Sequence, residues 1–327
     1  MKIVFLQDLN PGTVQYFKEK VPGHDLVFPQ TENVDEQAAA AAGADIVVGY
    51  RLPKKVADAA PDLKAFLTGA AGVDLTVVES LKGRPKVLVG NSHANSLDVA
   101  EHALALAMDT AKLIGRGDRD MRRGDWTLRY NDVGGQLLSG KTVLIVGYGA
   151  IGRAFAKLVA GFNMRVLGVR AKAARGERDD LGVETVALEE GLPVADLVLV
   201  FAPLTHRTKR MIGKGEFQAM KPTSILVNIS RGPVVDEDAL YQALRTGTIG
   251  GAGIDVWYQY PTSSDDVKHT APGKHPFHEL DNLVMSPHRA SYTERMHTAQ
   301  WDDVVENIHR IERGQGVKYA VDLSAGY

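Results

Sequence analysis

The stretch 141–170, KTVLIVGYGAIGRAFAKLVAGFNMRVLGVR, decides how the rest of this chain of 327 residues is interpreted. It contains an apolar run at 142–146, a turn rich in glycine, a helical pattern at 150–160 and a second apolar run at 164–169. This order is typical of a strand–helix–strand unit with parallel strands. The other segments can therefore be compared with the same pattern.

The turn in this unit carries the spacing G-x-G-x-x-G. Gly147 permits a sharp turn, Gly149 lets a pyrophosphate approach the backbone, and Gly152 lets helix and strand pack closely. The helix that follows would direct the N–H groups of its first turn, including those of Ala150 and Ile151, toward the phosphates. Because the motif lies between a predicted strand and a predicted helix, it indicates a dinucleotide site rather than a merely structural turn.

The second apolar run ends on Arg170, where an NAD site usually has an acidic residue that binds the ribose 2′-hydroxyl. Arginine cannot accept that hydrogen bond, but its planar guanidinium can pair with a 2′-phosphate. Lys172 and Arg175 add positive charge nearby. This favours NADP over NAD, and a solvated basic loop without cofactor preference is the alternative.

Composition narrows the classes of function. The chain is 44% hydrophobic and 24% charged, which is ordinary for a globular protein. A formal net charge of −2 gives no electrostatic reason to expect nucleic acid or an acidic membrane as partner, so we expect a small molecule. The chain has no cysteine, which excludes disulfides, thiolate metal sites and a cysteine nucleophile. The first apolar run is too short for a signal peptide, and we expect a cytoplasmic protein.

Apolar runs alternate with helical patterns on both sides of the glycine motif, which predicts an α/β fold with parallel sheets. The runs lie at 2–7, 25–28, 46–49, 63–67 and 86–89 before the motif, and at 195–201, 224–229, 250–256 and 283–286 after it. An amphipathic pattern at 293–313 can return to the first domain. We therefore expect two Rossmann-like or flavodoxin-like domains with a cleft between them: a discontinuous substrate domain, 1–97 with 289–327, and a dinucleotide-binding domain, 98–288.

The segment between the two series has two parts. Residues 96–117 form a long helical pattern that is apolar on most sides, which predicts a buried connector between the domains. Its excess apolar surface can also meet a second subunit, so a homodimer is expected. Residues 118–136 lack clear periodicity and are interpreted as an extended arm that Trp126 anchors.

Ligands of open parallel sheets gather beyond the carboxyl ends of the strands. Site candidates at the strand ends of the second series are Pro203, Leu204, Thr205, Asn228, Ser230, Arg231, Gly232 and Asp255.

Five separated motifs, VGYGAIG, FAPLTHRTKRMI, NISRGPVVDEDAL, GAGIDVW and SPHRAS, occur in the order found in the D-isomer-specific 2-hydroxyacid dehydrogenases. The chain resembles that family from about residue 68 to residue 297. The resemblance implies hydride transfer between a nicotinamide and a small 2-keto or 2-hydroxy acid, such as glyoxylate or hydroxypyruvate. It also implies that Glu101 and His102 are structural, and it argues against metal binding by the histidines at 269, 275 and 278.

The same resemblance implies the catalytic pair. Arg231 is similar to the family's substrate arginine, whose planar fork can bind carboxylate and carbonyl oxygens and polarise the carbonyl. His288 is similar to the family's general acid and base, a role that suits an imidazole titrating near neutral pH. The alternatives are a surface ion pair for Arg231 and a structural role for His288.

One position departs from the family. Where the family usually has a glutamate that pairs with the histidine, this chain has Tyr260. We expect a lower pKa for His288 than in a carboxylate-paired site, and a phenol that can orient the ring by a hydrogen bond. The segment DVWYQYP also resembles NAD-dependent formate dehydrogenases, which have glutamine at the glutamate position, although Gln259 lies one residue early.

The resemblance implies further binding residues in the first domain. Ala71, Gly72 and Val73 would present backbone N–H groups to the substrate carboxylate. Asn95 matches the substrate asparagine of the formate enzymes, with a helix N-terminal role as the alternative. Arg51 is a second candidate for the anion, with an exposed loop arginine as the alternative.

The remaining cofactor contacts are expected beyond the strands of the second domain. Asp255 would accept a hydrogen bond from the nicotinamide carboxamide, and Thr205 and Thr208 would lie near the pyrophosphate and ribose unless they only cap turns. The other expected contacts are Pro203, Ile229, Ser230 and His288.

These features favour an NADP-preferring reductase of small 2-keto acids. A formate-dehydrogenase-like enzyme, or another hydride-transfer enzyme that does not act on hydroxyacids, is the first alternative because of Tyr260. A dinucleotide-sensing binding protein like the dehydrogenase-related corepressors is the second alternative, and the presence of Arg231 and His288 argues against it.

Overall fold

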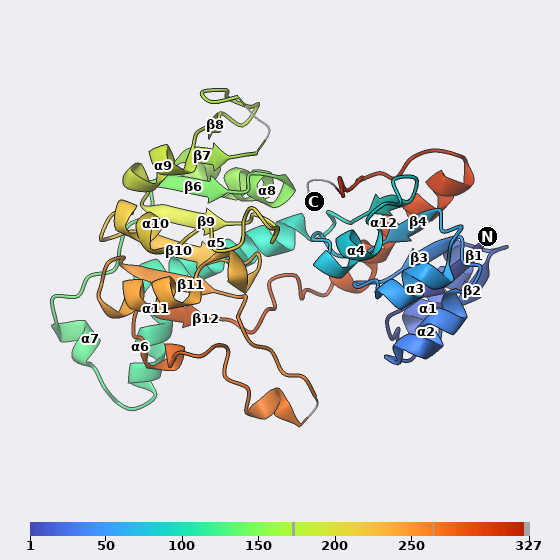
Figure 1. Ribbon diagram of the computed structural model, residues 1–327. Helices are drawn as coiled ribbons and strands as arrows, with labels where there is room; N and C mark the ends of the chain where they lie inside the picture. Colours follow the sequence, from blue (N-terminus) through green and yellow to red (C-terminus); the bar gives the residue numbers. More distant parts are fainter. Residues whose placement is uncertain (172–173, 264, 324–327) are drawn as a thin grey trace. The chain divides into compact units, whose positions relative to one another are not determined.

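The computed structural model describes residues 1–171, 174–263 and 265–323. It divides into two compact units, Met1–Asn95 with Thr293–Tyr327, and Ser96–Tyr292 (Figure 1). Within the described ranges, no helix is both long and apolar enough to cross a membrane. Each unit is built on one sheet of parallel strands, so the predicted α/β class is confirmed.

The sheet of the first unit has the strand order β2-β1-β3-β4-β5. Its strands are β1 (Lys2–Phe5), β2 (Asp25–Val27), β3 (Ile46–Val48), β4 (Ala65–Leu67) and β5 (Leu88–Gly90). All neighbouring strands pair in parallel. This is the flavodoxin-like order, in which the chain starts inside the sheet and changes direction between β1 and β3.

Helices cover both faces of this sheet. One face is covered by α2 (Val34–Ala41), α3 (Lys54–Ala59) and α4 (Leu75–Ser80), and the other by α1 (Pro11–Lys20) and α12 (Met296–Glu312). Phe17 of α1 packs against Trp301 of α12 with ring centroids 5.5 Å apart. The last helix of the chain therefore completes the first unit, and the predicted discontinuity is confirmed (Figure 1).

The sheet of the second unit has the order β12-β11-β10-β9-β6-β7-β8. Its strands are β6 (Thr142–Val146), β7 (Arg165–Val169), β8 (Glu184–Thr185), β9 (Leu197–Val200), β10 (Ile225–Asn228), β11 (Gly251–Ile254) and β12 (Leu283–Met285). The chain reverses its direction of progress between β6 and β9, as in a Rossmann sheet, and ligands of such sheets bind at that point. The glycine turn follows β6 and therefore lies at the reversal.

Both faces of the second sheet are also covered. The helices α5 (Ser96–Lys112) and α8 (Ala150–Leu158) contribute to the hydrophobic core of one face. The helices α9 (Leu188–Gly191), α10 (Lys214–Ala219) and α11 (Glu237–Arg245) cover the other face. The strands are apolar on both sides for this reason, which is why they are continuous apolar runs in the sequence.

Two predictions about residues 96–136 are wrong. The long helix ends at Lys112 because Leu113 has a left-handed backbone with φ of 58°, and a new helix, α6 (Ile114–Met121), follows. The carboxylate of Asp109 accepts the N–H of Gly115 at 2.5 Å, which supports the first turn of the new helix. The segment predicted as an extended arm is partly helical, at α6 and α7 (Thr127–Tyr130). Trp126 is 56% exposed and does not anchor it.

Candidate active site

The glycine turn after β6 is shaped by backbone sterics. Gly147 has a φ of +90°, and a Cβ atom there would lie 2.4 Å from the backbone nitrogen of Ala202. The N–H groups of Gly147 and Tyr148 donate to the carbonyl of Val169 at 3.1 and 3.0 Å. Gly149 immediately precedes α8, and no atom lies within 4 Å of the position its Cβ would take. Open space at a helix N-terminus fits a dinucleotide pyrophosphate.

The ribose end of the predicted cofactor site lies beyond β7. The guanidinium of Arg170 is 5.8 Å from the ring centroid of Tyr148, whose hydroxyl donates to Asp179 at 2.7 Å. Burial and this carboxylate raise the pKa of Tyr148, so its hydroxyl stays protonated. Arg175 is turned toward Glu190 at 3.4 Å, and Lys172 lies outside the described residues.

The turn after β9 is held by threonine side chains. Thr208 donates from its hydroxyl to the carbonyl of Pro203 at 2.5 Å and accepts the N–H of Thr205 at 2.8 Å. These hydrogen bonds cap the turn, which is the alternative to cofactor binding that the sequence left open for Thr205 and Thr208. Contact with a cofactor stays a prediction for Pro203 and Thr208.

Arg231, Asp255 and His288 follow β10, β11 and β12, which are three consecutive strands of the sheet. Since parallel strands end at the same edge, the loops that carry these residues lie side by side. Burial and charge effects agree with this proximity, because the charges of Arg231 and Asp255 both act on the imidazole of His288. The structure therefore brings together the three residues that sequence patterns single out for hydride-transfer chemistry.

The loop of Arg231 is organised by buried Asn228. Its side-chain oxygen accepts the N–H and the hydroxyl of Ser230, both at 3.1 Å, and its amide donates to the carbonyl of Arg231 at 3.2 Å. The next residue is Gly232, where a Cβ would lie 2.3 Å from the carbonyl oxygen of Trp257. Only glycine permits this close approach, which brings the arginine loop against the segment that carries Tyr260.

Asp255 is completely buried and holds the loop that follows β12. Its carboxylate accepts the hydroxyl of Ser286 at 2.5 Å and the backbone N–H groups of Arg289 and Ala290 at 2.9 and 3.0 Å. His102 lies 3.4 Å away. Burial disfavours the charged carboxylate, but the hydrogen bonds from His102, Ser286 and the two amides outweigh it, so the pKa of Asp255 is below its usual range.

His288 lies inside this loop in a left-handed conformation with φ of 57°. Such a backbone is strained for a residue with a Cβ and persists where surrounding contacts hold it. The hydrogen bonds that Asp255 accepts on both sides of His288 supply that constraint. Sequence patterns did not reveal this function of Asp255, and the hydrogen bond to a nicotinamide carboxamide stays a prediction.

The hydroxyl of Tyr260 lies 2.9 Å from Nδ1 of His288, and it accepts the backbone N–H of Trp257 at 3.0 Å. The phenol thus contacts the ring nitrogen for which a carboxylate partner is missing. His288 reaches solvent, but the protein around its ring lowers its pKa by desolvation. The charge of Arg231 lowers that pKa further, against the opposing effect of Asp255.

The segment that carries Tyr260 is irregular but well fixed. The N–H groups of Tyr258 and Gln259 both donate to the carbonyl of Pro272 at 3.0 Å, and the hydroxyl of Tyr258 donates to the carbonyl of Val235 at 3.2 Å. The two backbone hydrogen bonds to Pro272 determine where the phenol of Tyr260 can reach.

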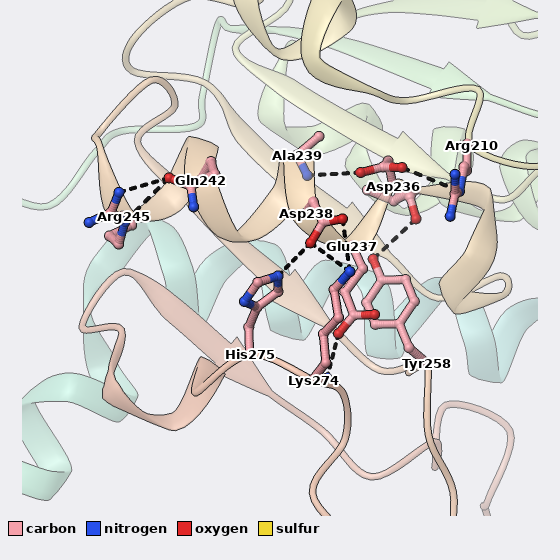
Figure 2. A network of polar contacts seen from close by, with 11 residues as sticks. Arg210, Asp236, Glu237, Asp238, Ala239, Gln242, Arg245, Tyr258, Lys274 and His275 are labelled. Atoms are coloured by element: carbon pink, nitrogen blue, oxygen red, sulfur yellow. Dashed lines mark hydrogen bonds and ion pairs between the residues drawn. The ribbon is translucent and has the colours of Figure 1, made fainter.

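Ion pairs to the start of α11 fix the far end of the same segment (Figure 2). Lys274 donates from its backbone to Glu237 at 2.6 Å and from its ammonium to Asp238 at 2.8 Å. His275 contacts Asp238 at 2.7 Å and stacks on Tyr241. His275 therefore has a structural role here, and the described residues contain no group of three His, Cys, Asp or Glu side chains placed to hold a metal ion.

The candidates of the first unit share an edge of its sheet. Arg51 follows β3, Ala71, Gly72 and Val73 follow β4, and Asn95 follows β5, which are adjacent parallel strands. Arg51 pairs with Asp74 at 3.8 Å in an exposed contact. The side-chain oxygen of Asn95 is buried and has no hydrogen-bond partner among the described residues. It is thus able to accept a hydrogen bond from a ligand.

Comparison with known proteins agrees with this geometry. Residues 104–290 match the family described as D-isomer specific 2-hydroxyacid dehydrogenase, NAD binding domain. A glyoxylate reductase from Korarchaeum cryptofilum (strain OPF8) is 36% identical over 263 residues, which cover 80% of this chain and 76% of that protein.

Two solved structures resemble this one over nearly the whole chain. An acyclic imino acid reductase in complex with NADPH and D-Arg has a TM-score of 0.83 at 25% identity, covering 98% of this chain and 100% of the other. An NADPH-dependent glyoxylate/hydroxypyruvate reductase from Sinorhizobium meliloti in complex with NADP and malonate has a TM-score of 0.80 at 25% identity, covering 99% and 97%.

Proposed function

This chain belongs to the D-isomer-specific 2-hydroxyacid dehydrogenase family and is an NAD(P)-dependent dehydrogenase or reductase. We propose that it reduces a small 2-oxo acid and that Arg231 and His288 are its catalytic residues. The observation that carries the proposal is that Arg231 and His288 follow the parallel strands β10 and β12, at the same edge of the sheet as the glycine turn after β6. A nicotinamide bound along this edge would supply the hydride.

Arg231 and His288 have different proposed roles in the reaction. Arg231 binds carboxylate and carbonyl oxygens of the substrate and draws electron density from the carbonyl carbon. His288 gives a proton at Nε2 to the carbonyl oxygen in reduction and removes one from the hydroxyl in oxidation. Residues 71–73, Asn95 and Arg51 are proposed to bind the substrate carboxylate.

Glyoxylate and hydroxypyruvate are the proposed type of substrate. The support is the name of the glyoxylate reductase that is 36% identical to this chain over 263 residues, and the name of the Sinorhizobium enzyme with a similar structure. A steady-state screen of 2-oxo acids with NADPH and NADH tests this. Turnover of glyoxylate or hydroxypyruvate is the expected result, and no turnover of any 2-oxo acid with either cofactor would refute the proposal.

NADP is the proposed preferred cofactor. Arg170 follows β7 and lies near the ring of Tyr148, and both similar solved structures carry NADP or NADPH. Gly147, Gly149 and the first turn of α8, with Ala150, Ile151 and Gly152, are proposed to hold the pyrophosphate; Pro203, Thr208, Ile229, Ser230 and Asp255 are proposed to complete the site.

A second candidate function is reduction of a 2-imino acid. The presence of Tyr260 in place of the carboxylate favours it. A protonated C=N group already carries the proton that a carbonyl oxygen must receive, so its reduction does not need a histidine that a carboxylate keeps protonated. The similar imino acid reductase supports the comparison. Oxidation of NADPH by a 2-oxo acid only when an amine is added, with formation of the amino acid, would favour this candidate.

A homodimer is also proposed. Large apolar side chains of the segment 114–137 are exposed: Ile114, Met121, Trp126, Tyr130, Val133 and Leu137. A second copy of the same chain would remove this surface from water. Light scattering during size exclusion tests it, and a monomeric mass at micromolar concentration would refute it.

A further inference from the structure

The contacts of the Tyr260 hydroxyl indicate which hydrogen bond it accepts and which it donates. The backbone N–H of Trp257 can only donate, so at 3.0 Å it uses a lone pair of the phenol oxygen. The phenol keeps its own hydrogen for Nδ1 of His288 at 2.9 Å. A phenol is a strong donor and a neutral imidazole nitrogen a strong acceptor, and the N–H of Trp257 strengthens the phenol as a donor. This arrangement leaves the ring proton of neutral His288 on Nε2.

Nε2 is the free end of the ring. It has no hydrogen bond to any residue that the structure describes, whereas Nδ1 faces the phenol. The charged groups that act on His288 are Arg231 from the loop after β10 and Asp255 from the end of β11. Burial and the charge of Arg231 lower the pKa of His288. The charge of Asp255 opposes them but does not cancel them, so the pKa lies below its ordinary value and the ring is mostly neutral at neutral pH.

A carboxylate partner would give the opposite tautomer. A carboxylate only accepts hydrogen bonds, so it would hold the proton of the neutral ring on Nδ1 and leave Nε2 bare. Such a neutral ring cannot donate a proton to a substrate, and reduction would depend on the imidazolium. With a phenol as partner, reduction need not depend on the imidazolium, because the phenol can donate a hydrogen bond to Nδ1 as well as accept one.

We propose that Tyr260 is the proton source for reduction, delivered through His288, so that the neutral enzyme can complete the reaction without an imidazolium. The proposal rests on the proposed function of His288 as general acid. Tyr260 is a positioning residue in this scheme, since it acts only through the imidazole.

The step balances. When the carbonyl carbon accepts a hydride, the electron pair of the C=O π bond moves to the oxygen, which takes the proton of Nε2. The electron pair of that N–H bond stays in the ring, and Nδ1 takes the phenol proton with its lone pair. Tyr260 becomes a phenolate. Burial and the charge of Asp255 raise the pKa of Tyr260 and so make this phenolate short-lived, while the N–H of Trp257 and the charge of Arg231 partly offset them. Tyr260 is 44% exposed, so water can return its proton.

The tautomer of His288 tests the proposal without cofactor or substrate. Nitrogen-15 NMR of the full chain, with the signal assigned by a His288→Asn variant, should show Nε2–H and a bare Nδ1 above the pKa. The Tyr260→Glu variant should show Nδ1–H instead, and Tyr260→Phe a mixture. A bare Nε2 in the wild-type protein would overturn the proposal, whether or not the protein reduces 2-oxo acids.

The pH profile of reduction is the second test. The wild-type rate should stay within about twofold from pH 6 to pH 8, while the rate of Tyr260→Phe should fall by about tenfold per pH unit as His288 loses its proton. Tyr258→Phe, which removes a hydroxyl bonded to the carbonyl of Val235, is the matched control and should keep the wild-type profile. A Tyr260→Phe profile identical to wild type would also overturn the proposal.

Discussion

Two turns at the same edge of the second sheet are built on different principles. The glycine turn after β6 is determined by contacts between backbone atoms, since a Cβ at Gly147 would lie 2.4 Å from Ala202. The loop after β12 is held by a side chain from another strand, the buried carboxylate of Asp255, which accepts hydrogen bonds on both sides of His288.

The difference predicts how a substitution in each turn affects stability and binding. A backbone contact leaves no room for any added atom, so damage to the glycine turn should reduce stability and cofactor binding together. A loop held by one carboxylate can lose its order while the sheet stays intact, so damage there should reduce the free energy of unfolding by less. Four variants are described below, from the largest expected effect to the smallest. Gly147→Ala and Asp255→Asn test this contrast directly, and Arg231→Ala and Arg170→Ala test the substrate and cofactor contacts at the same edge.

Arg231→Ala should lower kcat/KM for the 2-oxo acid by about a thousandfold, because the transition state loses its charged donor, a loss of about 4 kcal/mol. The free energy of unfolding should change little, since among the residues that the structure describes the guanidinium bonds only the neighbouring carbonyl of Ser230. Arg231→Lys is the control and should recover part of the activity by charge alone. Full activity in Arg231→Ala would remove arginine from the mechanism.

Gly147→Ala should reduce the free energy of unfolding by about 3 kcal/mol, because the new Cβ clashes with the backbone and φ is +90°. Urea denaturation measures the change. Gly149→Ala is the matched control, as no atom lies within 4 Å of its Cβ position, and it should weaken dinucleotide binding with a smaller loss of stability. Equal stabilities of the two variants would contradict the steric account of the turn.

Asp255→Asn should reduce the free energy of unfolding by about 2 kcal/mol at neutral pH, since the buried N–H groups and hydroxyl lose a charged acceptor. The folded-state pKa of Asp255 lies below its ordinary value of 3.8, so its contribution is present above that value and disappears as the pH falls through the folded-state pKa. The stability difference between the two proteins should therefore narrow in acid. A difference that grows in acid would contradict the assignment.

Arg170→Ala should raise the KM for NADPH by about tenfold and leave the KM for NADH nearly unchanged, because only NADPH carries the 2′-phosphate. Arg175→Ala is the comparison variant and should have a smaller effect, since Arg175 is turned toward Glu190. An equal rise for both cofactors would assign Arg170 a role other than recognition of the phosphate.

Sequence patterns predicted the strands of both sheets except β8 to within a few residues, because strands buried on both faces are continuous apolar runs. The strand β8 has only two residues, Glu184 and Thr185, and forms no such run. The break at Leu113 could not be predicted, since the apolar pattern continues through it and only the backbone conformation changes. Trp126 was misjudged for a related reason: an aromatic residue in an irregular segment suggests burial, but its neighbours leave it exposed.

The sequence by itself determined the dinucleotide turn and the family, because the glycine spacing, the Ser-Arg-Gly and Ser-Pro-His motifs and the absence of a glutamate at position 260 are all local patterns. The sequence also suggested that the phenol of Tyr260 orients His288 in place of that glutamate, and the tertiary structure decided how. The hydroxyl of Tyr260 contacts His288 and accepts from Trp257, and Asp255 holds the loop of His288 from another strand. Hydrogen bonds between segments about thirty residues apart depend on the assembled sheet, so no local pattern can specify their direction.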